Sequence, residues 1–251
     1  MREQAKLPLL LKELKLSTMG KLWEPMAEEA LKEGWNYPRF LASLCEHEVE
    51  ERYQKRVVRF LKNSYLPAGK SLATFDFSHV PSLSKAKVQE LASNTQWITQ
   101  GETLLIFGPS GVGKTHLASA IGHGLIERGV RVLFTPTTNL MQRLQLARKN
   151  LTLAADLNKL DRYGLIILDD IGYVKKDDAE THVLFELIAH RYESKSLIVT
   201  SNQPFSEWDQ IFASNAMTVA AIDRLVHHAT IFEVVTESYR RLHSLEKKPN
   251  E

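Results

Sequence analysis

Glycines, one lysine and one threonine gather in the stretch GPSGVGKT at residues 108–115. The stretch matches the phosphate-binding pattern G-x-x-x-x-G-K-[ST], whose glycines let backbone N–H groups turn inward toward phosphate oxygens. In that chemistry the lysine reaches the outer phosphates and the threonine hydroxyl ligates Mg²⁺. The pattern therefore predicts a nucleotide site made of Gly108, Pro109, Ser110, Gly111, Val112, Gly113, Lys114, Thr115 and His116.

The flanks of this loop distinguish it from a glycine-rich turn that contains a lysine by coincidence. The apolar run TLLIF at 103–107 precedes it, and a helical apolar pattern follows it from Leu117 to Leu125. A strand, a loop and a helix in this order suit phosphate binding, because the helix N-terminus adds its positive end to the site. His116 is expected to pack or cap beside the loop and not to act in catalysis.

A second apolar run ends in two carboxylates, LIILDD at 165–170. Adjacent acids at the end of a buried strand are costly unless they meet a cation or water. We therefore expect Asp169 to hold Mg²⁺ together with Thr115, and Asp170 to orient or deprotonate an attacking water. The alternative is a solvated turn, because Gly172 follows closely and acids favour such positions.

Two further side chains complete the candidate set. The run LIVTSN at 197–202 ends in Asn202, whose amide would lie near the γ-phosphate if this strand lies between the two strands above. An asparagine before a turn is also common for local reasons. Arg224, in the helical stretch 216–229, either pairs with Asp223 or is solvated, or it reaches the γ-phosphate of a neighbouring subunit.

Two kinds of structure must position these residues. Residues 1–64 carry helical patterns, in which Thr18 is expected to cap one helix, Gly34 to end it, and Pro38 to lie in the first turn of the next. Prolines, a glycine and serines break the pattern at 64–84, which we interpret as a domain boundary.

Beyond that break, short apolar runs alternate with helical stretches. The runs occupy 103–107, 130–135, 165–169, 197–201 and 230–236. Nearly unbroken apolar strands separated by helices predict a parallel sheet that is covered on both faces. We expect an α/β fold with a five-stranded parallel sheet, preceded by a small all-α N-terminal domain.

The motifs, taken in order, resemble those of AAA+ P-loop ATPases. GPSGVGKT, LIILDD, Asn202 and Arg224 are similar to Walker A, Walker B, sensor 1 and the arginine finger of that class. Finer details are similar to IstB-like proteins over essentially the whole chain, namely SYLPAGKSLATFDF, THLASAIG, LDDIGY, SNQPFSEW, AIDRLVHHA and ESYR. The resemblance implies an ATP- and Mg²⁺-dependent homo-oligomer that binds target DNA and recruits and stimulates a transposase.

The same resemblance implies two domains, a helical one at 1–68 with oligomer, DNA or partner contacts, and an AAA+ ATPase domain at 69–251. Asp170 stands where AAA+ proteins often have glutamate, so we expect slow hydrolysis that DNA or a partner stimulates. Few residues follow the last expected strand, so a C-terminal lid is expected to be absent or vestigial. Without a lid, the nucleotide is expected to be held at the interface between subunits, so Arg224 becomes more important. Whether Arg240 or Arg241 acts as a second sensor stays open.

Two basic clusters are candidates for DNA contact. Arg52, Lys55, Arg56, Arg59 and Lys62 recur at three- and four-residue spacing, which places them on one helix face. They either contact phosphates or form a solvated face, aided by Glu48 and Glu51 one turn earlier. Arg143, Arg148 and Lys149 form the second cluster, in a region that faces DNA in related ATPases but that also suits an ordinary amphipathic helix.

The bulk composition narrows the remaining alternatives. A net charge of +2 does not by itself indicate a nucleic-acid partner, and the single cysteine, Cys45, cannot form an internal disulfide. With no signal or membrane-span pattern at the start, we expect a cytoplasmic protein without a membrane partner. No cysteine or histidine lies at zinc spacing from His227 and His228, so no structural metal site is expected. A replicative helicase loader, a P-loop phosphotransferase and an adaptor that binds ATP without hydrolysis remain as alternatives.

Overall fold

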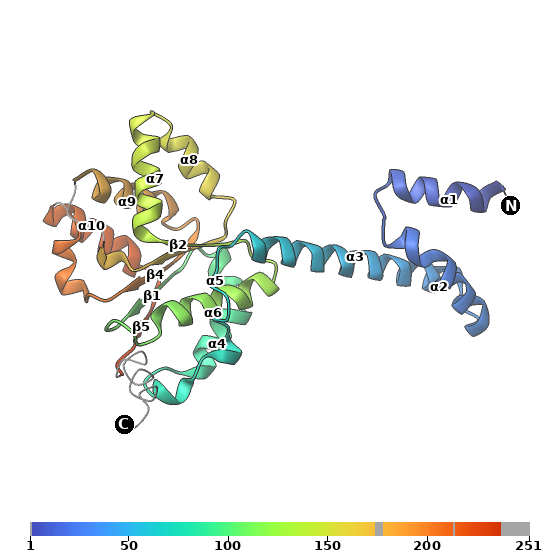
Figure 1. The fold of residues 1–251 in the computed structure, drawn as a ribbon, viewed down its shortest axis with the longest axis horizontal. Coiled ribbons are helices and arrows are strands. Elements are labelled where there is room, and N and C mark those ends of the chain that lie inside the picture. Colours follow the sequence, from blue (N-terminus) through green and yellow to red (C-terminus); the bar gives the residue numbers. More distant parts are fainter. Residues whose placement is uncertain (1, 174–177, 213, 237–251) are drawn as a thin grey trace, which may run out of the picture. The chain divides into compact units, whose positions relative to one another are not determined.

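The computed structural model describes residues 2–173, 178–212 and 214–236, which belong to two compact units, Met1–Arg59 and Phe60–Glu251 (Figure 1). The first unit contains the helices α1 (Arg2–Glu13) and α2 (Met19–Glu33) and most of α3 (Tyr37–Lys62). These units are defined by contacts within the chain, and the division into functional domains after residue 68 stays a prediction.

The N-terminal unit is organised around a small apolar cluster, made of Leu11, Met19, Met26 and Leu44. Gly34 ends α2 in a left-handed conformation with a φ of 66°, as the sequence predicted. The prediction that the Thr18 side chain caps α2 is wrong, because it makes no capping hydrogen bond. Instead the Glu48 carboxylate, from α3, accepts hydrogen bonds from the backbone N–H groups of Thr18 at 2.7 Å and Met19 at 3.0 Å.

The second unit is built on a sheet of five parallel strands, which confirms the expected fold class. The strands are β1 (Thr103–Phe107), β2 (Val132–Pro136), β3 (Leu165–Asp169), β4 (Ser196–Ser201) and β5 (Ala229–Glu233), and their order in the sheet is β2-β3-β4-β1-β5. Since all are parallel, their carboxyl ends lie at one edge, where ligands bind in open α/β sheets. β4, the strand that ends before Asn202, lies between β1 and β3. This is the strand order for which the sequence predicts the Asn202 amide near the γ-phosphate.

Helices cover both faces of the sheet (Figure 1). The helical elements of this unit are η1 (Leu72–Thr74), η2 (Phe77–His79), α4 (Lys85–Ser93), α5 (Gln96–Thr99), α6 (Lys114–Glu127), α7 (Thr137–Lys149), α8 (Leu153–Leu160), η3 (Ile171–Tyr173), α9 (Asp178–Arg191), η4 (Phe205–Gln210) and α10 (Asn215–Val226). On one face, side chains of α7, α8, α9 and α10 join alternate strand residues in the main apolar cluster. On the other face α6 packs against β3 and α4. No helix in the described ranges is long and apolar enough to cross a membrane.

Candidate active site

The loop between β1 and α6 has the backbone of a phosphate cradle. Gly108, Gly111 and Gly113 have φ angles of 150°, 88° and 98°, which residues other than glycine rarely adopt. A Cβ atom on Gly108 would overlap the carbonyl oxygen of Val234, so this position requires glycine even apart from its dihedral angles. The curl of the loop directly precedes α6, whose first residue is Lys114.

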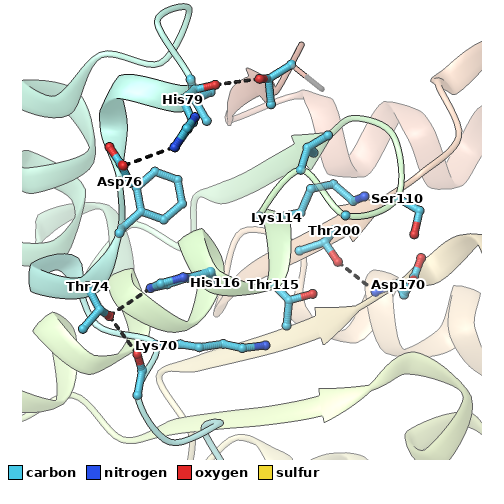
Figure 2. Close-up of a pocket in the computed structure, with 17 residues that line it drawn as sticks. Lys70, Thr74, Asp76, His79, Ser110, Lys114, Thr115, His116, Asp170 and Thr200 are labelled. Carbon is cyan, nitrogen blue, oxygen red and sulfur yellow. Dashed lines mark hydrogen bonds and ion pairs between the residues drawn. The ribbon is translucent and has the colours of Figure 1, made fainter. Parts of the chain in front are cut away.

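A cavity of about 410 Å³ opens in front of this loop (Figure 2). Its volume is within the range of small-molecule and cofactor sites. Of the predicted site residues, those from Ser110 to His116 and Asp170 line it, whereas Gly108, Pro109, Asp169, Asn202 and Arg224 do not. The remaining lining residues are Gly69, Lys70, Thr74, Phe75, Asp76, His79, Val80, Thr200 and Thr236.

The ammonium group of Lys114 lies within the loop. Its Nζ donates hydrogen bonds of 2.8 Å to the carbonyl oxygens of Gly108 and Pro109, and the side chain is buried. A phosphate group would offer this ammonium charge-assisted hydrogen bonds, which are stronger than those to neutral carbonyls. The loop therefore encloses a positive charge that a phosphate group could reach.

Asp169 is held by two hydroxyl groups from neighbouring elements. Thr115 Oγ1 donates to Asp169 Oδ2 at 3.0 Å, and Thr200 Oγ1 donates to Asp169 Oδ1 at 2.8 Å. A carboxylate beside a threonine hydroxyl at the base of a phosphate loop is the hard oxygen donor set that Mg²⁺ prefers. The pair Thr115 and Asp169 therefore fits the predicted metal site.

Asp170 faces the cavity from the turn after β3. Its φ of 62° lies in the left-handed region, which is uncommon for a residue with a side chain. Its backbone N–H donates a 2.8 Å hydrogen bond to Thr200 Oγ1, which holds the turn in this conformation. Figure 2 shows Asp170 beside Thr200 and beneath Ser110 of the phosphate loop. Such strained backbone positions concentrate at functional sites.

Asn202 and Arg224 lie outside the cavity. The exposed Asn202 places its Oδ1 against Gly172, so closely that a Cβ on Gly172 would overlap it. Arg224 donates from Nη1 to the Ala220 carbonyl at 2.8 Å, and its guanidinium lies 5.1 Å from the centre of the Phe185 ring. The structure thus places Asn202 beside the turn that follows the two acids, and it places the Arg224 guanidinium against α9.

The position of Arg224 relative to the sheet is informative. It precedes Ala229, which pairs with Thr103 at the amino end of β1, whereas the phosphate loop follows the carboxyl end of β1. The two sites are thus at opposite edges of the sheet. Arg240 and Arg241, the other arginines considered as sensors, lie outside the described residues.

Each of the two basic clusters contains side chains that are paired with acids. Arg52 Nε donates to Glu48 Oε1 at 2.8 Å, and Nη2 donates to the Lys15 carbonyl at 2.6 Å. Arg143 lies 3.7 Å from Asp156. Lys55 lies 3.1 Å from Glu51. The other candidates, Arg56, Arg59, Lys62, Arg148 and Lys149, have exposed side chains.

Sequence reasoning missed the segment 69–80 as part of the site. His116 Nε2 lies 3.0 Å from the Ser71 carbonyl oxygen and 3.2 Å from Thr74 Oγ1, and the Phe75 ring meets the imidazole edge-on. Burial lowers the pKa of His116 below its ordinary value. The composition of this segment indicates a domain boundary, although SLATFDF also belongs to the motifs of the family resemblance. Thr200 was missed because it lies within the apolar β4.

Three exposed side chains meet near the amino ends of the strands. One ligand atom from each of Glu193, His227 and His228 lies within 4.8 Å of the others, although the sequence pointed to no metal there. The Tyr192 hydroxyl lies 2.7 Å from His227 Nδ1, so a hydrogen bond already occupies this nitrogen. In this structure His227 is therefore hydrogen-bonded to Tyr192, which lies outside the three-residue cluster.

Known proteins share much of this sequence. A family model described as IstB-like ATP binding protein matches residues 9–247. An ATP-binding protein of an insertion sequence in Sinorhizobium fredii is 52% identical over 246 residues, which are 98% of this chain and 83% of that protein. The ATP-binding protein of insertion sequence IS21 in Pseudomonas aeruginosa is 37% identical over 234 residues, which are 93% of this chain and 88% of that protein.

Solved structures share the fold at lower identity. AMPPCP-bound DnaA from Aquifex aeolicus has a TM-score of 0.56 at 20% identity, over 73% of this chain and 57% of that one. The DnaC helicase loader has a TM-score of 0.52 at 21% identity, over 67% of this chain and 98% of that one. At these identities the likeness concerns the fold alone, and it confirms the predicted AAA+ P-loop architecture.

Proposed function

Since this chain belongs to the family of IstB-like ATP-binding proteins, we propose that it is an assembly ATPase of insertion-sequence transposition. In this proposal the protein assembles on duplex target DNA as an ATP-dependent homo-oligomer, and there it recruits and stimulates its transposase. The chain is an ATP-binding protein, and its family and phosphate-loop site make it an ATPase. DNA binding, assembly and transposase recruitment are the steps proposed here.

The position of Arg224 carries the assembly proposal. Arg224 comes shortly before the amino end of β5, whereas the phosphate loop follows the carboxyl end of β1, so in this proposal Arg224 acts on the nucleotide of a neighbouring chain and not on that of its own. An arginine supplied by a neighbour can stabilise the charge that develops on the γ-phosphate and raise the rate by several powers of ten. Hydrolysis would then require assembly, because only a neighbouring subunit completes the site.

Each remaining site residue has a proposed task. The loop from Gly108 to His116 binds the phosphates, with Lys114 on the outer ones, and Asn202 orients the γ-phosphate. Thr115 and Asp169 would hold Mg²⁺, which when bound neutralises charge on the phosphate oxygens.

Asp170 is proposed to orient or deprotonate the attacking water. Because its side chain is one methylene shorter than glutamate, we expect slow turnover that rises when DNA or the transposase is present. Fast turnover of the purified protein alone would contradict this expectation.

Exposed basic residues are the first candidates for DNA contact in this proposal. Arg56 on α3, and Arg148 and Lys149 at the end of α7, have solvent-exposed side chains. Arg52 and Arg143 share their charge with Glu48 and Asp156, so we expect smaller contributions from them. Contacts of this kind go to phosphates and carry no sequence preference of their own.

The decisive experiment measures particle mass by mass photometry in the presence of ATP and Mg²⁺. It is run with duplex DNA, with single-stranded DNA and with neither, for the wild type and for Arg224→Ala. Arg128→Ala, a change of an exposed arginine at the end of α6, serves as the control. The proposal expects large particles that need ATP and duplex, that persist in the control, and that disappear in Arg224→Ala.

Other outcomes have defined meanings. Assembly on single strands only would favour a replicative helicase loader, and a monomer in every condition would overturn the assembly step. Binding of a fluorescent ATP analogue must be intact in Arg224→Ala, so that loss of particles reports assembly and not loss of nucleotide. A strand-transfer assay with the cognate transposase then tests stimulation directly.

A further inference from the structure

A second cavity, of about 260 Å³, lies where β2 and β3 begin. Arg131 directly precedes β2, Arg162 and Tyr163 precede β3, and Asn63 and Tyr65 follow α3. Because the strands are parallel, this edge of the sheet is opposite the edge that carries the phosphate loop. We call it the arginine–tyrosine cavity, defined by Asn63, Tyr65, Arg131, Arg162 and Tyr163.

The cavity combines two positive charges with no negative charge in its lining. No carboxylate within the described ranges lies within 4.0 Å of the guanidinium of Arg131 or of Arg162, and no acid lines the cavity. By contrast, the buried Arg191 nearby lies 4.0 Å from Asp161. Two like charges around one cavity repel each other unless an anion neutralises them.

Aromatic rings hold both guanidinium groups. Arg131 lies 5.0 Å from the centre of the Phe60 ring, and Arg162 lies 4.9 Å from the centre of the Tyr163 ring. Arg162 Nη2 also donates to the Tyr163 hydroxyl at 3.1 Å. Each guanidinium has five N–H donors, so stacking on a ring restricts its motion but leaves donors for a ligand. Phosphate oxygens match this donor geometry.

The backbone conformation and the exposure of Tyr65 are a second observation about this cavity. Its φ is 57°, in the left-handed region that glycine or asparagine usually fills after a helix, and its side chain is 73% exposed. The conformation is imposed by its neighbour, because the buried Ser64 accepts a 2.7 Å hydrogen bond at its carbonyl from Phe134 N–H in β2. The exposed Tyr65 ring therefore lies in the lining of the cavity, where it is accessible to a ligand.

We propose that the arginine–tyrosine cavity binds a backbone phosphate of duplex DNA. Arg131 and Arg162 hold the phosphate oxygens, the Asn63 amide donates a further hydrogen bond, and Tyr65 packs against the adjoining sugar. The inference rests on the proposed DNA-binding function and gives it a contact remote from the ATP site. Since the ligand group is a phosphate, binding here is independent of base sequence and weakens with salt.

The test measures affinity for a fluorescent duplex by anisotropy over a range of KCl concentrations. Arg131→Gln and Arg162→Gln are compared with Arg128→Gln, which removes the same charge from an exposed position at the end of α6. We expect about a tenfold loss of affinity for each cavity variant, and a salt dependence reduced by about one phosphate equivalent. The Arg128 control should change both values much less.

Tyr65→Gly separates a binding role from a structural one. Glycine relieves the strained backbone, so the melting temperature should stay the same or rise, while DNA affinity falls about threefold or more. Unchanged affinity in the arginine variants, with wild-type ATP binding, would overturn the cavity assignment and leave the proposed function standing. If the wild type itself binds no duplex, the proposed function fails first.

A final arm distinguishes the source of the phosphate. Inorganic phosphate and mononucleotides are tested for thermal protection of the wild type and of the double variant Arg131→Gln/Arg162→Gln, with the ATP site saturated. Protection that needs both arginines, together with unchanged duplex affinity, would show a small-molecule site and reject the DNA assignment. Loss of duplex affinity, with weak protection by the small phosphates, supports the assignment.

Discussion

The Thr200 hydroxyl donates a 2.8 Å hydrogen bond to Asp169 Oδ1 and accepts one of 2.8 Å from the backbone N–H of Asp170. One side chain from β4 therefore orients both acids at the end of β3. Replacing it with the isosteric valine removes both hydrogen bonds and leaves the packing volume almost unchanged.

We expect Thr200→Val to slow ATP hydrolysis roughly ten- to a hundredfold, because the two acids lose their common anchor. ATP affinity should change less than about threefold, since the phosphate loop is untouched. Steady-state hydrolysis and titration with a fluorescent ATP analogue measure the two effects. Thr135→Val, at a partly buried position near the end of β2, is the control, and equal losses in both variants would contradict the assigned role.

Gly172→Ala tests Asn202 without altering it. The new Cβ would overlap Asn202 Oδ1, so the amide must move away from the turn that follows Asp170. If Asn202 orients the γ-phosphate, Gly172→Ala and Asn202→Ala should each lower hydrolysis by roughly tenfold or more, with similar ATP affinity. The control is Gly20→Ala in α2, where the nearest atom lies 4.0 Å from the added Cβ. Full activity in Gly172→Ala would count against a role for Asn202.

Arg191 should be essential for stability and not for catalysis. Its buried guanidinium donates to the carbonyls of Tyr163 at 3.1 Å and Ser196 at 3.0 Å, which joins the beginnings of β3 and β4. Burial lowers its pKa to about 10, against the opposing effect of Asp161, so the group stays charged near neutral pH.

Arg191→Met leaves these carbonyls without a donor and should reduce the free energy of unfolding by about 3 kcal/mol. For a chain of this size that corresponds to a fall in melting temperature of about 6–12 °C, measured by calorimetry. Arg128→Met, at an exposed site, should change it by less than about 2 °C. A melting temperature in Arg191→Met equal to that of the control would show that solvent replaces the lost donors.

Glu48 makes the N-terminal unit sensitive to acid. Burial alone would raise the pKa of its carboxyl, but hydrogen bonds from the Met19 and Thr18 N–H groups and from Arg52 outweigh that effect and lower the pKa. A depressed pKa means that the ionised group stabilises the fold fully above its ordinary pKa of 4.5. That stabilisation is lost as the pH falls through the lower pKa of the folded state.

Hydrogen exchange in the first turn of α2 measures this effect in the intact chain. Glu48→Gln should expose the Thr18 and Met19 amides already at neutral pH, through a loss of about 2 kcal/mol in local stability. The wild type should approach the same exchange rates only in acid. Glu46→Gln, at an exposed position of α3, should leave these rates unchanged, and a pH-independent pattern in the wild type would exclude Glu48 as the cause.

Much of the ATPase unit could be predicted from local pattern. The five apolar runs became the five strands, with ends displaced by a few residues. The strands inside the sheet are buried on both faces and must be apolar almost throughout, whereas the partly exposed β5 lies at the edge of the sheet. Lys114 and Thr115 could be identified because their spacing from Gly108 is set by the loop itself. Gly34 could be identified as a helix end because a single glycine allows the left-handed conformation that ends α2.

Residues that act across the fold could not be predicted in this way. Thr18 and Glu48 are far apart in sequence, so only the packing of α2 on α3 shows that a carboxylate replaces the expected threonine cap. Lys70, Phe75 and His79 join the phosphate loop around one cavity, although their segment has the composition of a linker. Arg131 and Arg162 precede different strands and meet only because β2 and β3 are neighbours.

The sequence by itself determined the phosphate loop, the acids that follow the next buried run, and the alternation of strands and helices. These features depend on neighbours in the chain, whose backbone conformation and burial period are local properties. Only the tertiary structure decided the order of the strands, and with it which polar groups meet. That order places Thr200 over Asp169, puts Arg224 at the edge opposite the phosphate loop, and brings two arginines around one cavity, because side-chain contacts depend on distance in space and not on distance along the chain.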